Sequence, residues 1–74
     1  MYLEPLFMDV LWKDLYHQAL KQHQPLPQLR ARALQAVECS GSETLRAQMP
    51  RYQVMPIYVV CVELDRYQIR PPAR

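Results

Sequence analysis

The sequence predicts an α+β fold: two amphipathic helices and a short third helix, followed by a C-terminal β-strand or hairpin. Three observations lead to this prediction. Apolar residues recur at spacings of three and four in two segments of the first half of the chain. A serine, the only glycine and a glutamate within residues 40–43 indicate a break and a helix restart. β-Branched and aromatic residues then dominate residues 51–70.

The chain length of 74 residues suits one small domain. Half of the residues are hydrophobic, which is typical of a folded chain and not of a disordered polar tail. We expect residues 1–70 to form the domain and residues 71–74, which are proline and arginine-rich, to form a flexible tail. A core of this size is marginal, and association with a partner is a common remedy.

Residues 6–22 have the pattern of an amphipathic helix. One face is apolar and carries Met8, Leu11, Trp12, Leu15, Tyr16 and Ala19. The opposite face carries Asp9, Lys13, His17 and Lys21 at a spacing of four. Pro25 and Pro27 should end the helix near His23, because residues before a proline are disfavoured in helical conformation.

Residues 27–38 have the pattern of a second helix. Its apolar stripe consists of Leu26, Leu29, Ala33, Ala36 and Val37. The short proline-containing loop before it favours an antiparallel helix pair. We therefore expect Trp12 and Leu15 of the first helix to pack against Leu29 and Ala33, and against the C-terminal strand.

A third, short helix is predicted over residues 41–48. Ser40 is followed three residues later by Glu43, the spacing of a capping box, and Pro50 should end the helix. Gly41 is the only glycine and therefore the best candidate for a positive φ.

Residues 51–70 carry the strongest strand signal, because Val54, Ile57, Val59, Val60, Val62 and Ile69 are β-branched and Tyr52, Tyr58 and Tyr67 are aromatic. An alternative fits the same residues. Ile57, Val60, Cys61, Leu64 and Gln68 also follow a helical spacing, and Pro56 could open that helix. The fold would then be a small all-α bundle. Consecutive β-branched residues favour the strand, since they lose side-chain freedom in a helix.

Composition argues against catalytic and metal sites. A single glycine cannot build a phosphate-binding loop, and His17, His23, Cys39 and Cys61 do not have metal-ligand spacing. We therefore expect no enzyme activity, no metal and no cofactor.

The ends and the apolar runs indicate a cytoplasmic protein. Glu4 and Asp9 lie where a secretory signal needs basic residues. The longest apolar run, residues 57–62, is too short to cross a membrane. The two cysteines are therefore expected to be reduced thiols.

The predicted function is a small protein-interaction module, a regulator, adaptor or inhibitor that acts by binding a partner protein. The partner would be a second copy in a homodimer or a larger host protein, contacted through the C-terminal β segment. The candidate interface residues are aromatic, basic or apolar: Tyr52, Met55, Tyr58, Val60, Arg66, Tyr67 and Arg70.

The alternative function is a nucleic-acid-binding transcriptional regulator. The net charge of +2 is mild, but the second half is arginine-rich, and Arg30, Arg32, Arg46 and Arg51 would contact phosphates. The second and third helices are also separated by about the length of a helix-turn-helix corner. The third helix, however, is short and carries little positive charge.

Overall fold

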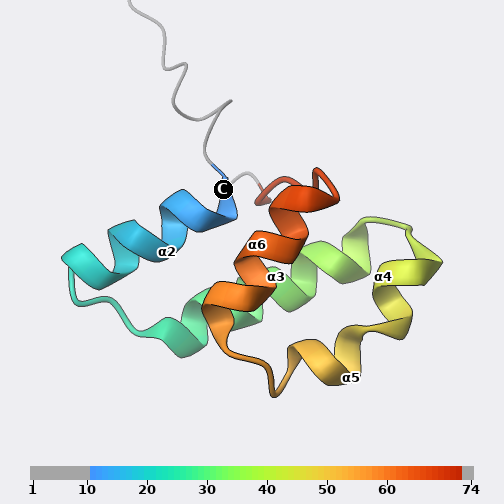
Figure 1. Cartoon of the computed structure of the whole chain (residues 1–74), viewed down its shortest axis with the longest axis horizontal. Coiled ribbons are helices and arrows are strands. Elements are labelled where there is room, and N and C mark those ends of the chain that lie inside the picture. The colour runs from blue at the N-terminus through green and yellow to red at the C-terminus, as the bar shows by residue number, and fades with distance from the viewer. Residues whose placement is uncertain (1–10, 73–74) are drawn as a thin grey trace, which may run out of the picture.

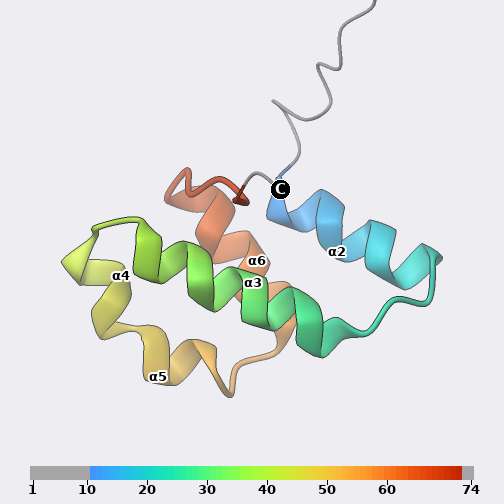
Figure 2. The same cartoon turned by 180° about the vertical axis from the view of Figure 1, so that it is seen from behind.

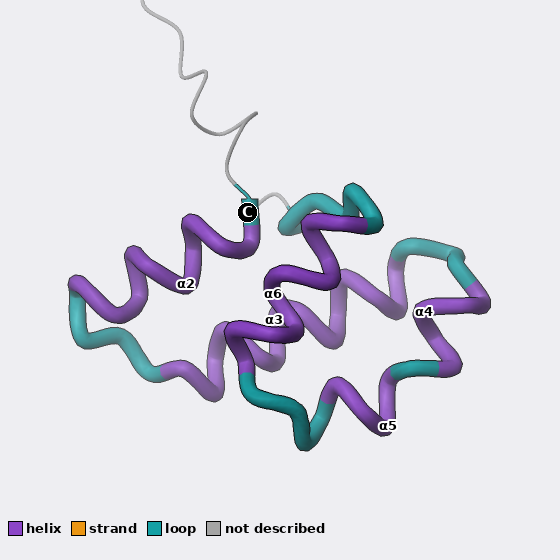
Figure 3. The backbone as a smooth tube through the Cα atoms, in the orientation of Figure 1, coloured by secondary structure: helices purple, strands orange, loops and turns teal. Residues whose placement is uncertain are grey.

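The structure is a computed structural model in which residues 11–72 are described, and this part of the chain is entirely helical (Figure 1, Figure 3). Its five helices are α2 (Trp12–Lys21), α3 (Leu26–Cys39), α4 (Glu43–Ala47), α5 (Met49–Tyr52) and α6 (Ile57–Arg66). No strand occurs within residues 11–72. The α+β prediction, with its C-terminal strand or hairpin, is therefore wrong, and the all-α alternative is correct.

Helix α6 replaces the predicted strand because of what its helical face can bury. Pro56 is extended and precedes the first turn, and Ile57, Val60, Cys61 and Leu64 are all buried at the spacing of one helix face. A β-branched residue costs only some tenths of a kcal/mol in a helix. Burying a valine, leucine or isoleucine side chain contributes about 1.5–3 kcal/mol. Packing of the helix therefore outweighs the local preference for a strand. The pairing of β-strands from two chains that the sequence suggested cannot occur through residues 57–66, because they are helical.

The helices enclose one core, in which α6 packs against α2 and α3 (Figure 1). Viewed from behind, α3 crosses the front of the molecule, with α4 and α5 at one side of it and α2 at the other (Figure 2). The buried core consists of Trp12, Leu29, Ala33, Ala36, Val37, Leu45, Tyr52, Ile57, Val60, Cys61 and Leu64. Trp12, Leu29 and Ala33, which were predicted to pack together, lie in this one core, Leu15 packs against it, and α6 takes the place of the strand.

The start of α2 is held by a carboxylate from α6. Leu11, at the N-cap, has extended backbone angles and gives no side-chain cap. The Asp65 carboxylate accepts the Trp12 backbone N–H at 2.8 Å and the Lys13 backbone N–H at 3.1 Å. The indole Nε1 of the fully buried Trp12 donates to the Ile69 carbonyl at 2.8 Å. The two bonds to Asp65 satisfy backbone donors at the start of α2, and the third satisfies the buried indole N–H.

A second polar chain connects α3, α5 and α6. Arg30 Nη1 donates to the Tyr52 carbonyl at 2.6 Å, and the Tyr52 hydroxyl donates to Glu63 Oε1 at 2.7 Å. The Tyr52 side chain is fully buried, so its hydroxyl needs this partner. The four-residue helix α5 is therefore fixed in place by bonds from two longer helices.

The first two helices follow most of the predicted pattern, but their boundaries differ, and Leu11, predicted on the apolar face, is exposed and precedes α2. Helix α2 begins at Trp12 because Leu11 is extended, and the part of the prediction that covers residues 6–10, with Met8 and Asp9, lies outside the described residues. Ala19 is buried, whereas Lys13, His17 and Lys21 are exposed as expected. The second helix is one residue longer at each end than predicted, and its apolar stripe is buried apart from the half-buried Leu26.

The corner after α3 differs from the prediction in its capping residue. Ser42, not Ser40, is the N-cap of α4, and its Oγ accepts the Leu45 N–H at 3.2 Å. Ser40 Oγ instead donates to the Val37 carbonyl at the end of α3. Gly41 has the predicted positive φ, of 74°. Pro50 does not simply end the third helix, because it lies in the first turn of α5.

Two residues other than glycine also adopt positive φ, and each closes a helix. His23 (φ 55°) follows α2 and Gln68 (φ 61°) follows α6. In both places the next residue donates to the carbonyl five residues before it, Gln24 N–H to the Ala19 carbonyl and Ile69 N–H to the Leu64 carbonyl. This is the Schellman pattern, which usually contains glycine. At Gln68 it turns the chain so that the Ile69 carbonyl reaches Trp12.

Replacement of Asp65 by alanine should destabilise the protein by about 0.5–2 kcal/mol, because two N–H groups of α2 lose their acceptor. Asp65→Asn keeps one acceptor oxygen and should cost less. Urea denaturation provides the measurement. Glu38→Ala removes one negative charge from an exposed position and is the matched control. Equal stability of Asp65→Ala and Glu38→Ala would contradict this role of Asp65.

Replacement of Ser42 by alanine should cost about 0.5–2 kcal/mol, because the Leu45 N–H loses its cap. Thr44→Ala, at an exposed position in the same short helix, is the control. Thermal melting of the two variants should give a lower midpoint for Ser42→Ala only.

The free energy of unfolding should fall as the pH rises above about 9. Burial, with a smaller effect from Asp65, raises the pKa of the Cys61 thiol from 9.0 to about 12. Burial and the Glu63 hydrogen bond likewise raise the pKa of Tyr52 above its ordinary value. Both groups then ionise more readily in the unfolded chain. Their stabilising contribution is complete below the unfolded pKa and is lost as the pH approaches the folded one.

Urea denaturation between about pH 7 and about pH 11 measures this loss. Cys61→Ala should flatten the dependence of stability on pH above about 9. Cys39→Ser, which alters an exposed thiol, is the matched control and should keep the slope of the parent chain. An unchanged slope in Cys61→Ala would show that the buried thiol does not contribute.

Candidate functional site

Helix α6 is apolar beyond the face that it buries. Its solvent-facing side carries Tyr58, Val59, Val62 and Arg66, which we call the outer face of α6. Tyr58 is 40% exposed and Val59 is 39% exposed, Val62 is half-buried and Arg66 is exposed. Positions 58, 62 and 66 are spaced by four, so they form one ridge along the helix. The ridge is about 12 Å long, or about two turns.

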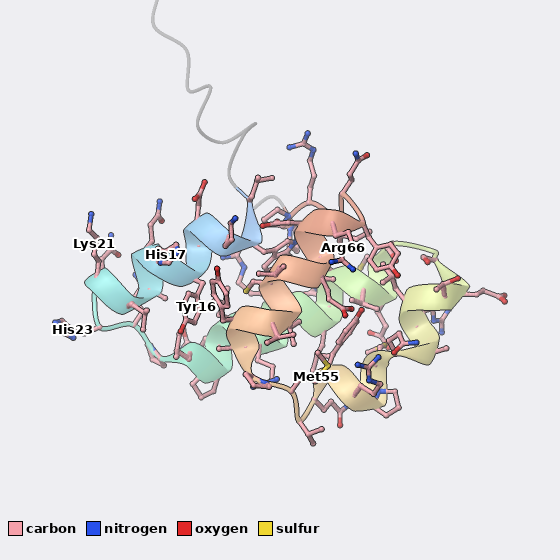
Figure 4. All side chains as sticks on the ribbon, viewed as in Figure 1. Tyr16, His17, Lys21, His23, Met55 and Arg66 are labelled. Atoms are coloured by element: carbon pink, nitrogen blue, oxygen red, sulfur yellow. The ribbon has the colours of Figure 1, made fainter. Side chains whose placement is uncertain are left out.

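An aromatic cluster joins the outer face of α6 to α2. The Tyr16 and Tyr58 ring centroids are 5.1 Å apart, and the His17 ring lies 5.6 Å from Tyr16 and 6.1 Å from Tyr58. The Tyr16 and His17 rings meet edge to face at 72°, a geometry that aromatic pairs favour, and both rings are tilted at 60° to the Tyr58 ring. Figure 4 shows Tyr16 and His17 on α2, on the side toward α6. The two helices thus present one continuous surface.

The exposed charges of α2 and α6 are mainly basic. Lys13, Lys21 and Arg66 are exposed, and Asp14 is the one exposed carboxylate on these two helices. The carboxylates of Glu63 and Asp65 are half-buried and accept hydrogen bonds from within the protein. Figure 4 shows Lys21 and Arg66 at well-separated points of this side of the molecule. The apolar surface is therefore bordered by cations.

The structure divides the interface residues predicted from the sequence into two groups. Tyr52 and Val60 are fully buried, so they belong to the core and not to an exposed surface. Met55 is half-buried and packs against the core. The others are exposed: Tyr58 and Arg66 on the outer face of α6, and Tyr67 and Arg70 beyond its end.

The arginines that were predicted to contact nucleic acid do not form one surface. Arg30 is half-buried and bonded to the Tyr52 carbonyl, and Arg32 Nη2 lies 3.5 Å from the Pro72 carbonyl. Arg46 and Arg51 are exposed, and Arg51 also donates to the Gln48 side chain. The helix after the α3 corner, α4, has five residues, which is short for a helix that reads a DNA groove.

Residues 11–72 give little support for a metal site, a membrane span or a catalytic pocket. Within this range no three His, Cys, Asp or Glu side chains are grouped as metal ligands, and Cys39 and Cys61 are free thiols. None of the described helices is long and apolar enough to span a membrane. A hollow of about 380 Å³ between α2 and α3 is lined mostly by apolar and amide groups: Leu15, Gln18, Ala19, Gln24, Pro25, Gln28, Leu29 and Arg32. It lacks a carboxylate, histidine or thiol for catalysis.

Four residues of this surface were missed by the sequence analysis as interface candidates: Tyr16, His17, Val59 and Val62. The sequence pattern predicts Tyr16 on the buried face of its helix and His17 on the solvated face, and their contact with Tyr58 depends on how α2 lies against α6. Val59 and Val62 had a usable signal. In the helical alternative for residues 57–68 they fall away from the buried positions, where Val59 is exposed and Val62 is half-buried.

Comparison with protein families, curated proteins and solved structures found no match to this chain, so its surface is interpreted from its own residues.

Proposed function

We propose that this protein is a small protein-interaction module, a regulator, adaptor or inhibitor, whose contact surface is the outer face of α6 together with the aromatic cluster. The observation that supports this proposal is the exposure of Tyr58 and Val59 on a helix whose other face already fills the core. Tyrosine and arginine are enriched in the centres of protein interfaces. Both occur on this ridge, at Tyr58 and Arg66.

The surface suits a protein partner better than a small molecule. It is a convex helix ridge bordered by a second helix, and a ridge of this kind packs into the groove of another helix or lies beside one. Small ligands instead need a concave site that covers most of their surface. The rings of the cluster already pack against each other, so little side-chain entropy would be lost on binding.

A photo-crosslinking amino acid in place of Val59 tests the proposal in the native cell. It should give a discrete adduct with another protein, whereas the same group at Gln35, which is exposed on α3, should not. The adduct should be lost when Tyr58→Ser is added, because the neighbouring part of the surface is then altered. It should persist when Thr44→Ser is added on α4.

The alternatives give different products in this experiment. An adduct of twice the chain's mass would identify the partner as a second copy of this chain instead of a different protein. An adduct with nucleic acid, or adducts that ignore Tyr58→Ser, would overturn the proposal. Thermal melting of each variant shows that the fold is retained, since surface substitutions usually change stability by less than about 0.5 kcal/mol.

A further inference from the structure

We infer that the outer face of α6 accepts an acidic amphipathic helix. This inference rests on the function proposed above and names the chemistry of the partner. It combines three features of the described residues: the length of the apolar ridge, the sign of the charges beside it, and the engagement of the nearby carboxylates in internal hydrogen bonds.

The ridge has the dimensions of a helix-binding surface. Tyr58 and Val62 are one turn apart, and Val59 lies beside them on the same side of α6. Tyr16 continues the apolar surface onto α2 through its ring contact with Tyr58. A partner helix that places apolar residues at positions i, i+3 or i+4 and i+7 would cover this length.

The charges beside the ridge select the sign of the partner. Arg66 lies one turn beyond Val62 on the ridge itself, and on α2 the charged Lys13 and Lys21 lie four residues before and after His17. His17 is part of the aromatic cluster, so this basic row borders the apolar surface directly. A partner with carboxylates around its apolar stripe would meet opposite charges on both sides.

The acidic residues of α2 and α6 neutralise only part of the positive charge beside the ridge. Asp65 is held by the N–H groups at the start of α2, where the helix dipole favours a negative charge. Glu63 is held by Tyr52 on the other flank of α6. Asp14 remains exposed on α2 and lies near His17, three residues along the helix. The exposed cations therefore outnumber the exposed carboxylates.

The same charges disfavour a second copy of this chain as the occupant. A two-fold interface across the outer face would bring the same patch from both chains together. The basic row and Arg66 of one copy would then face their equivalents in the other. Like charges placed against each other in an interface are unfavourable, whereas an acidic helix removes the conflict.

Titration of the full chain with synthetic peptides tests the inference. The probe is a helical peptide of about 14 residues with leucine at the apolar positions and glutamate at the others, and the control peptide carries lysine in place of glutamate. The glutamate peptide should bind at least about tenfold more tightly, and added salt should reduce the difference. Equal affinity of the two peptides would overturn the inference.

Charge reversal on the protein locates the binding. Arg66→Glu should weaken the glutamate peptide about tenfold and strengthen the lysine peptide. Arg46→Glu changes the net charge equally at an exposed position on α4, and should leave both affinities nearly unchanged. If Arg66→Glu fails to fold, Lys21→Glu gives the same test at the other end of the surface. Equal effects at positions 66 and 46 would mean unspecific attraction and would contradict the site.

The remaining outcomes separate this inference from the proposed function. A Val59 adduct in the cell without a preference for the glutamate peptide would retain the interaction module and reject the acidic helix. If neither the Val59 adduct nor the preference for the glutamate peptide is observed, both the interaction module and the acidic helix are rejected. Binding to vesicles of anionic lipid with the same dependence on Val59→Asp would assign the surface to membranes and overturn the inference.

Discussion

The arrangement of this small protein depends on one buried tryptophan and the carboxylate beside it. Trp12 is completely enclosed, yet its backbone N–H and its indole N–H both need acceptors. Asp65, in the last turn of α6, and the Ile69 carbonyl, in the turn that follows α6, provide them. Because Leu11 gives no cap, α2 can begin where it does only when α6 is in place. The contact thus fixes the start of one helix and the end of another, more than 50 positions apart.

The surface proposed to bind a partner follows from this contact. With its first turn beside Asp65, α2 brings Tyr16 and His17 against Tyr58. The buried side of α6 is filled by α2 and α3, and the other side stays in contact with solvent. A helix that is apolar on more than one side needs more cover than two neighbours supply. Tyr58 and Val59, which are exposed, and Val62, which is half-buried, are the part of α6 left uncovered within residues 11–72.

Residues that suggest an interface in the sequence can serve the fold instead. Tyr52 and Arg30 have the character of binding residues, but here they hold the short helix α5 between α3 and α6. A four-residue helix has almost no stability of its own, since helix nucleation is unfavourable. The tyrosine hydroxyl and the guanidinium are therefore used inside the molecule, which also removes Arg30 from any phosphate-binding surface.

The local features of the fold depend on residues that are close together along the chain. The apolar faces of α2 and α3, the proline-marked loop between them and the positive φ of Gly41 were predictable, because each depends on neighbours along the chain. Tyr58 and Arg66 were also identified as exposed candidates. The tertiary structure decided the rest. Ile57, Val60, Cys61 and Leu64 fit a strand pattern and a helix pattern alike, and only the faces of α2 and α3 made the helix the better way to bury them. The cap from Asp65 and the burial of Tyr52 and Val60 could not be predicted from the sequence either, because their partners are distant in sequence and close only in the folded chain.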